Sequence, residues 1–127
     1  DYFMPSIEEA KQISGAADVE GAGHFFIERG VKHCVFTLGG DGVCFMDATG
    51  AVLRQPAFQI EVVDTTGCGD AFDAGFITAL HRKMDVKTAL NFAQASAALV
   101  ATGLGSDAGI RSFEDTLNFM NTASIKQ

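Results

Sequence analysis

The first half of the chain combines helical and strand-like patterns of hydrophobic and polar residues. Ser6 and Glu9 form a capping-box pattern that predicts a helix to about Ile13, and Asp18 predicts the cap of a second helix that ends at Gly30. Continuous apolar runs then predict strands, and the glycines between the first two runs predict a hairpin turn. The strands are expected over residues 31–38, 43–46, 51–54 and 58–63.

Helical spacing dominates the second half. A helix is predicted from Ala71 to about Arg82, and Asp85 caps a further helix that continues to about Thr102. Ser112 caps the last predicted helix. Strands that alternate with helices in this way predict a layered α/β fold with a mostly parallel sheet, to which the short hairpin adds antiparallel strands.

The most informative segment joins a predicted strand to a predicted helix. Residues 64–75 read Asp-Thr-Thr-Gly-Cys-Gly-Asp-Ala-Phe-Asp-Ala-Gly. A glycine-rich turn at such a junction aims backbone N–H groups and the positive end of a helix at one point, which suits a phosphate group. Asp70 places a carboxylate at that point, where it can accept a proton from a hydroxyl that attacks the phosphate.

This pattern predicts phosphoryl transfer to an alcohol. Asp70 would be the general base, and the amides of Gly67, Cys68 and Gly69 would stabilise the transferring group. A purely structural alternative remains open, since an Asp at a helix start is also an ordinary cap and glycines at a turn can be there for geometry alone. The chain has no Gly-x-x-x-x-Gly-Lys-Ser/Thr sequence, which disfavours a P-loop NTPase.

Composition and charge narrow the class of protein. The chain has 127 residues, enough for one domain with a real core, and 47% of them are hydrophobic. The formal net charge of −7 argues against a nucleic-acid or anionic-membrane surface, because such surfaces need clustered Lys and Arg. It does not argue against ATP, because backbone amides and Mg²⁺ can hold the phosphates. No apolar run approaches the ~20 residues of a membrane span.

The three cysteines indicate a reducing cytoplasm rather than a disulfide framework or a zinc site. Their number is odd, and their spacing is not that of zinc ligands. Cys34 and Cys44 lie in apolar runs and are expected to be small core residues. Cys68 lies among helix N-terminal amides, which can lower the pKa of a thiol. It is interpreted first as a tolerated small residue, with a catalytic nucleophile as the alternative.

The segment from Asp64 to Asp70 resembles the second signature of the ribokinase-like (PfkB) carbohydrate kinase family, Asp-Thr-Thr-Gly-Ala-Gly-Asp, with Cys68 in place of the usual Ala. The resemblance extends from Pro5 to about Met120 and covers the C-terminal half of the family's pattern. It implies a three-layer α/β/α, Rossmann-like fold. It also implies that residues 1–127 are a partial domain, the nucleotide-binding and catalytic half of a PfkB-type kinase, with the N-terminal half and the lid absent.

Two further segments resemble the parts of the family that contact the nucleotide. The run Thr-Leu-Gly-Gly-Asp-Gly at 37–42 is similar to a family turn that lies along the nucleotide, although by itself it would be read as an ordinary hairpin turn. The run 91–97 is similar to the small-residue helix that lines the adenine pocket, although by itself it would be a core helix. The resemblance implies nucleotide contacts for Thr37, Gly39, Gly40, Gly42, Asn91 and Gln94.

The resemblance also implies metal ligands. Glu9 matches the acidic residue that holds Mg²⁺ through water, but Ser6 stands where the family has Asn, and the capping box alone can explain both residues. Asp64 and Thr66 match positions that help to bind a monovalent cation such as K⁺. Asp64 can equally brace the loop by accepting backbone N–H bonds.

The function that follows is ATP-dependent phosphorylation of a hydroxyl of a small sugar or sugar-like substrate, with ATP and Mg²⁺ as cofactors and K⁺ as a further expected ion. No nucleic-acid or membrane partner is expected. Half a sheet would leave apolar surface exposed, so a partner, a homodimer or poor solubility is expected, and the isolated chain is expected to be inactive.

Two alternatives come from other classes of protein. The first is a non-catalytic nucleotide-binding or assembly module. The second is a dehydrogenase domain of the Rossmann type, which is disfavoured because no Gly-x-Gly-x-x-Gly opens a helix after a strand.

Overall fold

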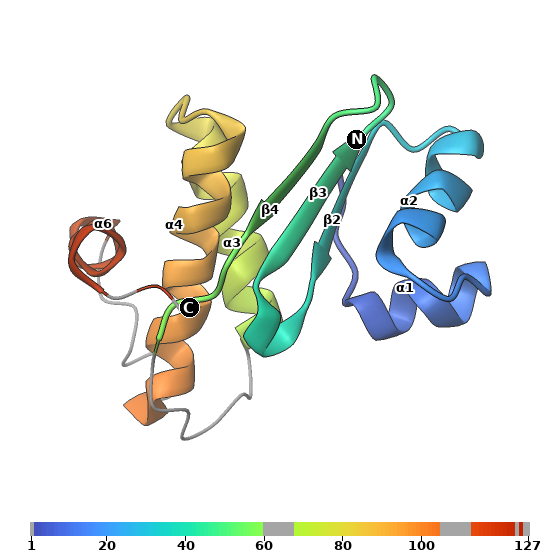
Figure 1. Ribbon diagram of the computed structural model, residues 1–127. Coiled ribbons are helices and arrows are strands. Elements are labelled where there is room, and N and C mark those ends of the chain that lie inside the picture. The colour runs from blue at the N-terminus through green and yellow to red at the C-terminus, as the bar shows by residue number, and fades with distance from the viewer. Residues whose placement is uncertain (1, 60–67, 105–112, 124, 126–127) are drawn as a thin grey trace. The chain divides into compact units, whose positions relative to one another are not determined.

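The computed structural model describes residues 2–59, 68–104, 113–123 and 125. The chain divides into two compact units, Asp1–Gln55 and Pro56–Gln127 (Figure 1).

The first unit is built on a four-stranded sheet with the strands in sequence order. Its strands are β1 (Tyr2–Phe3), β2 (His33–Thr37), β3 (Val43–Asp47) and β4 (Val52–Gln55). β1 pairs with β2 in parallel, whereas the pairs β2–β3 and β3–β4 are antiparallel. The predicted hairpin is therefore confirmed. The expectation of a mostly parallel sheet is wrong for the described strands, where one of three pairings is parallel.

Connection lengths explain these strand directions. β2 and β3 are joined by a single 3₁₀ turn, η1 (Gly39–Asp41), and the backbone φ values of +60° at Gly39 and +99° at Gly42 are ones that glycine adopts easily. In the next turn the Asp47 carboxylate accepts hydrogen bonds from the backbone N–H groups of Thr49 and Ala51. Connections this short can join only antiparallel strands, while the parallel pair β1–β2 is connected through two helices.

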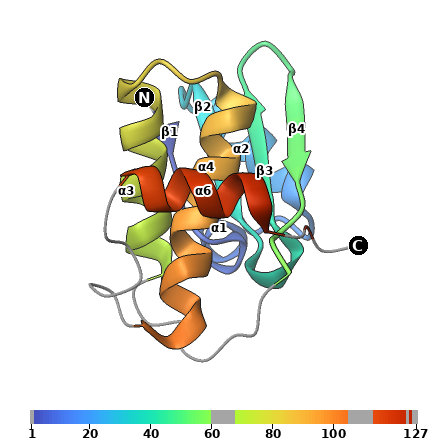
Figure 2. The same cartoon turned by 90° about the vertical axis from the view of Figure 1, so that its left-hand side faces the viewer.

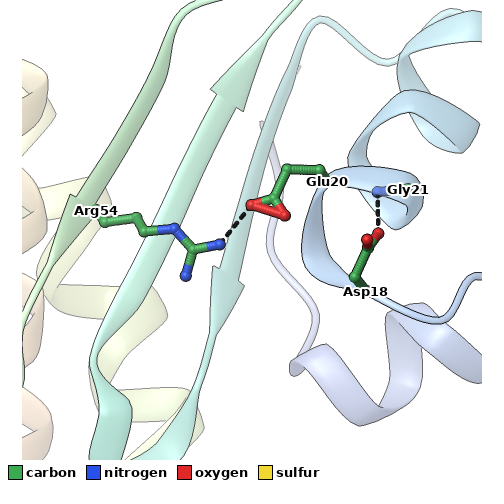
Figure 3. A network of polar contacts seen from close by, with 4 residues as sticks. All are labelled: Asp18, Glu20, Gly21 and Arg54. Carbon is green, nitrogen blue, oxygen red and sulfur yellow. Dashed lines mark hydrogen bonds and ion pairs between the residues drawn. The ribbon is translucent and has the colours of Figure 1, made fainter.

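Two helices, α1 (Ile7–Ser14) and α2 (Val19–Glu28), form that connection. Both are capped as the sequence predicts. The Ser6 hydroxyl accepts from the N–H of Glu9 while the Glu9 carboxylate accepts from the N–H of Ser6, which completes the capping box. The Asp18 carboxylate accepts from the N–H of Gly21 at 2.7 Å (Figure 3).

An ion pair joins α2 to the last strand of the sheet. The guanidinium of Arg54 on β4 donates to the carboxylate of Glu20 at 2.5 Å (Figure 3). This hydrogen bond lowers the pKa of Glu20. Both side chains are about half exposed, so water screens the pair and its contribution to stability is small.

The helices α1 and α2 cover one face of the sheet (Figure 1). The side chains buried there come from alternate positions of the strands, as a pleated strand requires. They are Ala10, Ala22, Phe26, Cys34, Phe36, Cys44 and Met46. Burial raises the pKa of the Cys34 thiol to about 11, so this cysteine is a core residue, as expected, and not a reactive one.

The other face of the same strands is also apolar. Val35, Val43 and Phe45 point there, and all three are buried. A sheet that is buried on both faces belongs to a layered α/β fold, and its strands read as continuous apolar runs in the sequence.

The second unit is helical in its described part. It contains α3 (Cys68–His81), α4 (Val86–Leu99), a π-helical turn η2 (Val100–Leu104) and α6 (Phe113–Thr122). α3 and α4 lie side by side as an antiparallel pair, and α6 crosses α4 (Figure 2). The N-terminal part of α6 is held by Phe113, whose ring lies 4.8 Å from that of Phe92 and 4.0 Å from the guanidinium of Arg82.

The start of α3 differs from the prediction. The helix begins at Cys68 rather than at Ala71, so Gly69 and Asp70 belong to its first turn instead of a preceding loop. An acidic side chain is favourable in a first turn because it faces the positive end of the helix dipole, and this outweighs the low helix propensity of Gly69.

A glycine allows α3 and α4 to pack closely. A Cβ atom on Gly75 would lie 2.5 Å from the Ser96 hydroxyl oxygen and 3.2 Å from the Cα of Ala93. The Ser96 hydroxyl is itself buried and donates to the carbonyl of Phe92. The contact therefore has no room for even one extra methyl group.

We expect Gly75→Ala to destabilise the protein by about 1–2 kcal/mol, because the cost of overpacking exceeds the gain in helix propensity. Thermal or urea unfolding would measure the change. Combining it with Ser96→Gly should recover most of the loss. Gly69→Ala is the matched control, since a Cβ there meets no atom within 4 Å. Equal stability of Gly75→Ala and the parent would contradict the packing argument.

A second stability test concerns the cap of α4. Thr88 donates to the Asp85 carboxylate from its N–H at 2.7 Å, and hydrogen bonding to Thr88 lowers the pKa of Asp85. A lowered folded-state pKa stabilises the fold above the unfolded value near 3.8, and this stabilisation is lost as the pH falls through the folded pKa.

Asp85→Asn retains a capping oxygen but does not titrate. We therefore expect the melting temperature of the parent to fall more than that of Asp85→Asn between pH 5 and pH 2. Calorimetric melting temperatures across about this range would show it. Parallel curves for the two proteins would contradict the assigned pKa shift.

Candidate active site

The first turn of α3 carries three of the predicted catalytic residues. Asp70 and Gly69 are exposed and Cys68 is half-buried. Among the described residues, no atom lies within 4 Å of a Cβ built on Gly69, so none of them fills the space beside it. The N–H groups of a first helical turn have no partner within the helix, and here they lie beside an exposed carboxylate.

The same turn is attached to α4. The thiol of Cys68 donates to the carbonyl of Ala97, with 3.5 Å between sulfur and oxygen. Further along α3, the side chains of Phe72 and Phe76 are buried and their rings stack. One side of α3 is therefore fixed in the core, while Asp70 lies on the exposed side. Gly67, Asp64 and Thr66, also predicted as site residues, lie outside the described residues.

In the first unit, the predicted nucleotide turn follows β2. Thr37 is half-buried, Gly39 and Gly40 are exposed, and Gly42 is buried. The N–H of Leu38 donates to the carbonyl of Gly42 at 2.8 Å and closes the turn. The exposed backbone at Gly39 and Gly40 carries no side chain, which leaves it open to a ligand.

The structure brings this turn beside the start of α1, which the sequence did not predict. Thr37 donates from its N–H to the carbonyl of Pro5 at 3.2 Å, and Ser6 pairs with Thr37 in a parallel bridge. Glu9 therefore lies on α1, the helix next to the nucleotide turn. This neighbourhood follows from the parallel pairing of β1 with β2, which continues in the same direction to the bridge between Ser6 and Thr37.

The capping box already uses the carboxylate of Glu9. It accepts from the N–H of Ser6 at 3.0 Å, and hydrogen bonds to the backbone and hydroxyl of Ser6 lower its pKa. Glu9 is therefore ionised at neutral pH, and its remaining lone pairs are available for a water that binds a metal. Among the described residues no three acidic, His or Cys side chains gather as a metal site. Direct Mg²⁺ binding by this part of the chain alone is thus not supported, while a contact through water fits the single carboxylate.

On α4, Asn91 and Gln94 differ in their surroundings. Asn91 is half-buried, whereas Gln94 is 8% exposed and donates from its Nε2 atom to the carbonyl of Pro56 at 2.9 Å. The side-chain donor of Gln94 therefore has a partner inside the protein. Sequence reasoning missed Pro56, because a carbonyl 38 positions away leaves no local signal.

The chain belongs to the pfkB family of carbohydrate kinases, whose family model matches residues 1–112. It is similar to the ribokinase of Haemophilus influenzae, with 33% identity over 97% of this chain and 42% of that protein. It is also similar to the aminoimidazole riboside kinase of Salmonella typhimurium, with 33% identity over 96% of this chain and 40% of that protein. The chain thus spans about two fifths of the length of these relatives.

A solved structure confirms the ribokinase-like α/β fold. A candidate ribokinase II of Escherichia coli, in complex with ATP and Mg²⁺, superimposes with a TM-score of 0.87 at 30% identity. The match covers 95% of this chain and 39% of that one. The resemblance inferred from the Asp-Thr-Thr-Gly-Cys-Gly-Asp segment is therefore confirmed at the level of family and fold.

No described helix has the length and apolar composition needed to cross a bilayer.

Glu9→Gln separates the two roles of Glu9. Gln also completes a capping box, so we expect near-normal thermal stability at neutral pH. If the charge of Glu9 also orders the water around Mg²⁺, the Mg²⁺ concentration that half-saturates ATP binding should rise about tenfold. Calorimetric titrations at several Mg²⁺ concentrations would measure this.

Glu8→Gln is the matched control, since Glu8 is an exposed acidic residue of the same helical turn. An unchanged Mg²⁺ requirement in a folded Glu9→Gln variant would leave Glu9 with the capping role alone.

Proposed function

We propose that this chain is the nucleotide-binding and catalytic part of an ATP-dependent sugar kinase, with Asp70 as its general base. One observation carries the proposal: in a pfkB-family chain, the exposed carboxylate of Asp70 lies in the first turn of α3 beside the open backbone of Gly69. A carboxylate at the N-terminus of a helix can accept a proton at the place where the negative charge of a phosphoryl group is stabilised.

The roles of the neighbouring residues are inferred from the signature sequence. The amides of Gly67, Cys68 and Gly69 would donate to the oxygens of the transferring phosphoryl group, and the positive end of α3 would add to their effect. Asp70 would take the proton of the attacking sugar hydroxyl. The hydroxyl oxygen then forms the new bond to phosphorus, and the bond from phosphorus to the leaving oxygen of ADP breaks.

The cofactors proposed are ATP and Mg²⁺, as in the Escherichia coli complex. Mg²⁺, when bound, would neutralise charge on the phosphates. Thr37, Gly39, Gly40 and Gly42 are proposed to lie along the nucleotide, with Asn91 near the adenine. Asp64 and Thr66 are proposed to help hold K⁺.

The proposed substrate is a small sugar or riboside with a free hydroxyl, in keeping with the names of the two relatives. We place the protein in the reducing cytoplasm because its three cysteines are an odd number with no disulfide-like pattern. Residues 1–127 would be the C-terminal half of the kinase domain, which would associate with a partner or as a homodimer.

The first experiment is a calorimetric titration of the chain with Mg·ATP and Mg·ADP, with and without K⁺. Saturable binding supports the nucleotide site. Turnover is then measured in a hybrid kinase, in which this chain replaces the matching segment of the Haemophilus influenzae ribokinase, with ribose, deoxyribose and aminoimidazole riboside as substrates. Nucleotide binding without any product would favour the non-catalytic module. This alternative is tested because the chain covers only about two fifths of the length of its relatives.

Asp70→Asn should lower kcat of the hybrid kinase about a thousandfold, because the amide cannot accept the proton of the hydroxyl. The Kd for Mg·ATP should change less than about twofold, because the binding contacts remain. Asp73→Asn, one turn further along α3, is the control and should keep its activity. Retention of most activity by Asp70→Asn would remove the general-base assignment.

A further inference from the structure

Pro56 and Cys68, the two residues that flank the segment 57–67, both form hydrogen bonds with one stretch of α4. At its entry, the Nε2 atom of Gln94 donates to the carbonyl of Pro56 at 2.9 Å. At its exit, the thiol of Cys68 donates to the carbonyl of Ala97 at 3.5 Å. The two partners on α4 are three positions apart, less than one turn of the helix.

Apolar packing reinforces the entry. Phe58 is 6% exposed and packs against Ala95 and Ala98 of α4, while its ring lies 5.4 Å from that of Phe119 on α6. Phe58 also pairs with Ile125 in an antiparallel bridge. The chain is thus fixed at Pro56 by a hydrogen bond and two residues later by burial, both against residues 94–98 of α4.

The exit bond is available because of where it falls on α4. Ala97 is in the last turn of the α-helix, which ends at Leu99 and continues as the π-helical turn η2. The carbonyl oxygen of Ala97 accepts a hydrogen bond from the N–H of Val100, and its second lone pair can accept one more. The thiol of Cys68 supplies one, which the Ala usual in this signature could not do.

We propose that Gln94 and Cys68 are positioning residues, which hold Pro56 and the first residue of α3 to one stretch of α4 and so set the placement of Asp70. This inference rests on the proposed function for its kinetic consequence. It also reassigns Gln94, whose side-chain donor holds Pro56 and is not free for adenine. Neither residue touches the reacting atoms; each acts through the backbone that it holds.

The two roles of Gln94 predict different results. A positioning residue changes kcat and leaves nucleotide affinity and base preference unchanged, because a small displacement of the base slows the chemistry without removing a binding contact. An adenine contact would instead raise the Kd for Mg·ATP and alter the preference for ATP over GTP.

The test uses Gln94→Met, which has similar length but no donor, and Cys68→Ala, which carries the usual residue of the signature. We expect each to lower kcat of the hybrid kinase about tenfold, with the Kd for Mg·ATP and the ATP:GTP ratio within about twofold of the parent. Cys68→Ser retains a hydroxyl donor and should recover part of the loss. Normal kcat in both variants would overturn the proposal, and so would a raised Kd for ATP with unchanged kcat in Gln94→Met.

A second readout does not depend on catalysis. The amides of residues 72–75 bond to the carbonyls of residues 68–71, so their hydrogen exchange reports opening of the first turn of α3. In the 127-residue chain we expect this exchange to quicken about fivefold in Gln94→Met and Cys68→Ala, with residues 78–81 unchanged. If the parent hybrid kinase makes no product, the proposed function fails while this exchange pattern still decides the positioning role. Unchanged exchange in both variants would overturn it.

Discussion

The contact between α3 and α4 is the constraint on which the candidate active site depends. Gly75 lies against Ser96 and Ala93 with no space for another methyl group, so the distance between the two helices is fixed by backbone and small side chains. Short contacts between rigid elements transmit position well, because they have few alternative arrangements. Asp70 lies five residues before Gly75 on the same helix, which is less than two turns, so its placement depends on this contact.

In the first unit, the corresponding constraint is the parallel run of β1 beside β2. It continues past the strands to bring the cap of α1 against Thr37, which puts the charged end of Glu9 on the element next to the exposed glycines of η1. Local capping and long-range pairing thus meet at one end of the sheet. Loops at the ends of strands are where α/β folds place their ligand sites, and the predicted nucleotide turn has this position.

The sequence predicts the local features of the fold well. The caps at Ser6, Asp18 and Asp85 and the hairpin around residues 39–42 each depend on residues within four positions of one another. Pairings between distant segments leave no such signal, which is why the contacts of Thr37 with Pro5 and of Gln94 with Pro56 were missed. The start of α3 was placed three residues late because glycine is a poor helix former, although a first turn tolerates it.

The site residues were found through their type and order rather than through their surroundings. Asp70 and the glycines could be chosen because a short stretch of sequence is enough to indicate their chemistry. The burial of Gln94, in contrast, depends on how α4 packs. The sequence pattern of a polar side chain on a helix is the same whether that side chain binds a ligand or donates a hydrogen bond to a carbonyl within the core. Only the position of Pro56 distinguishes these two roles.

The close approach at Gly75 also bears on how this part of the chain can change over evolutionary time. Because the Ser96 side chain occupies the space that a residue larger than glycine would need, side-chain volume at the two positions is shared. Among relatives that keep this helix pair, a larger residue at position 75 should occur with a smaller one at position 96. The two positions are then expected to covary, although they lie on two different helices and are 21 positions apart in the sequence.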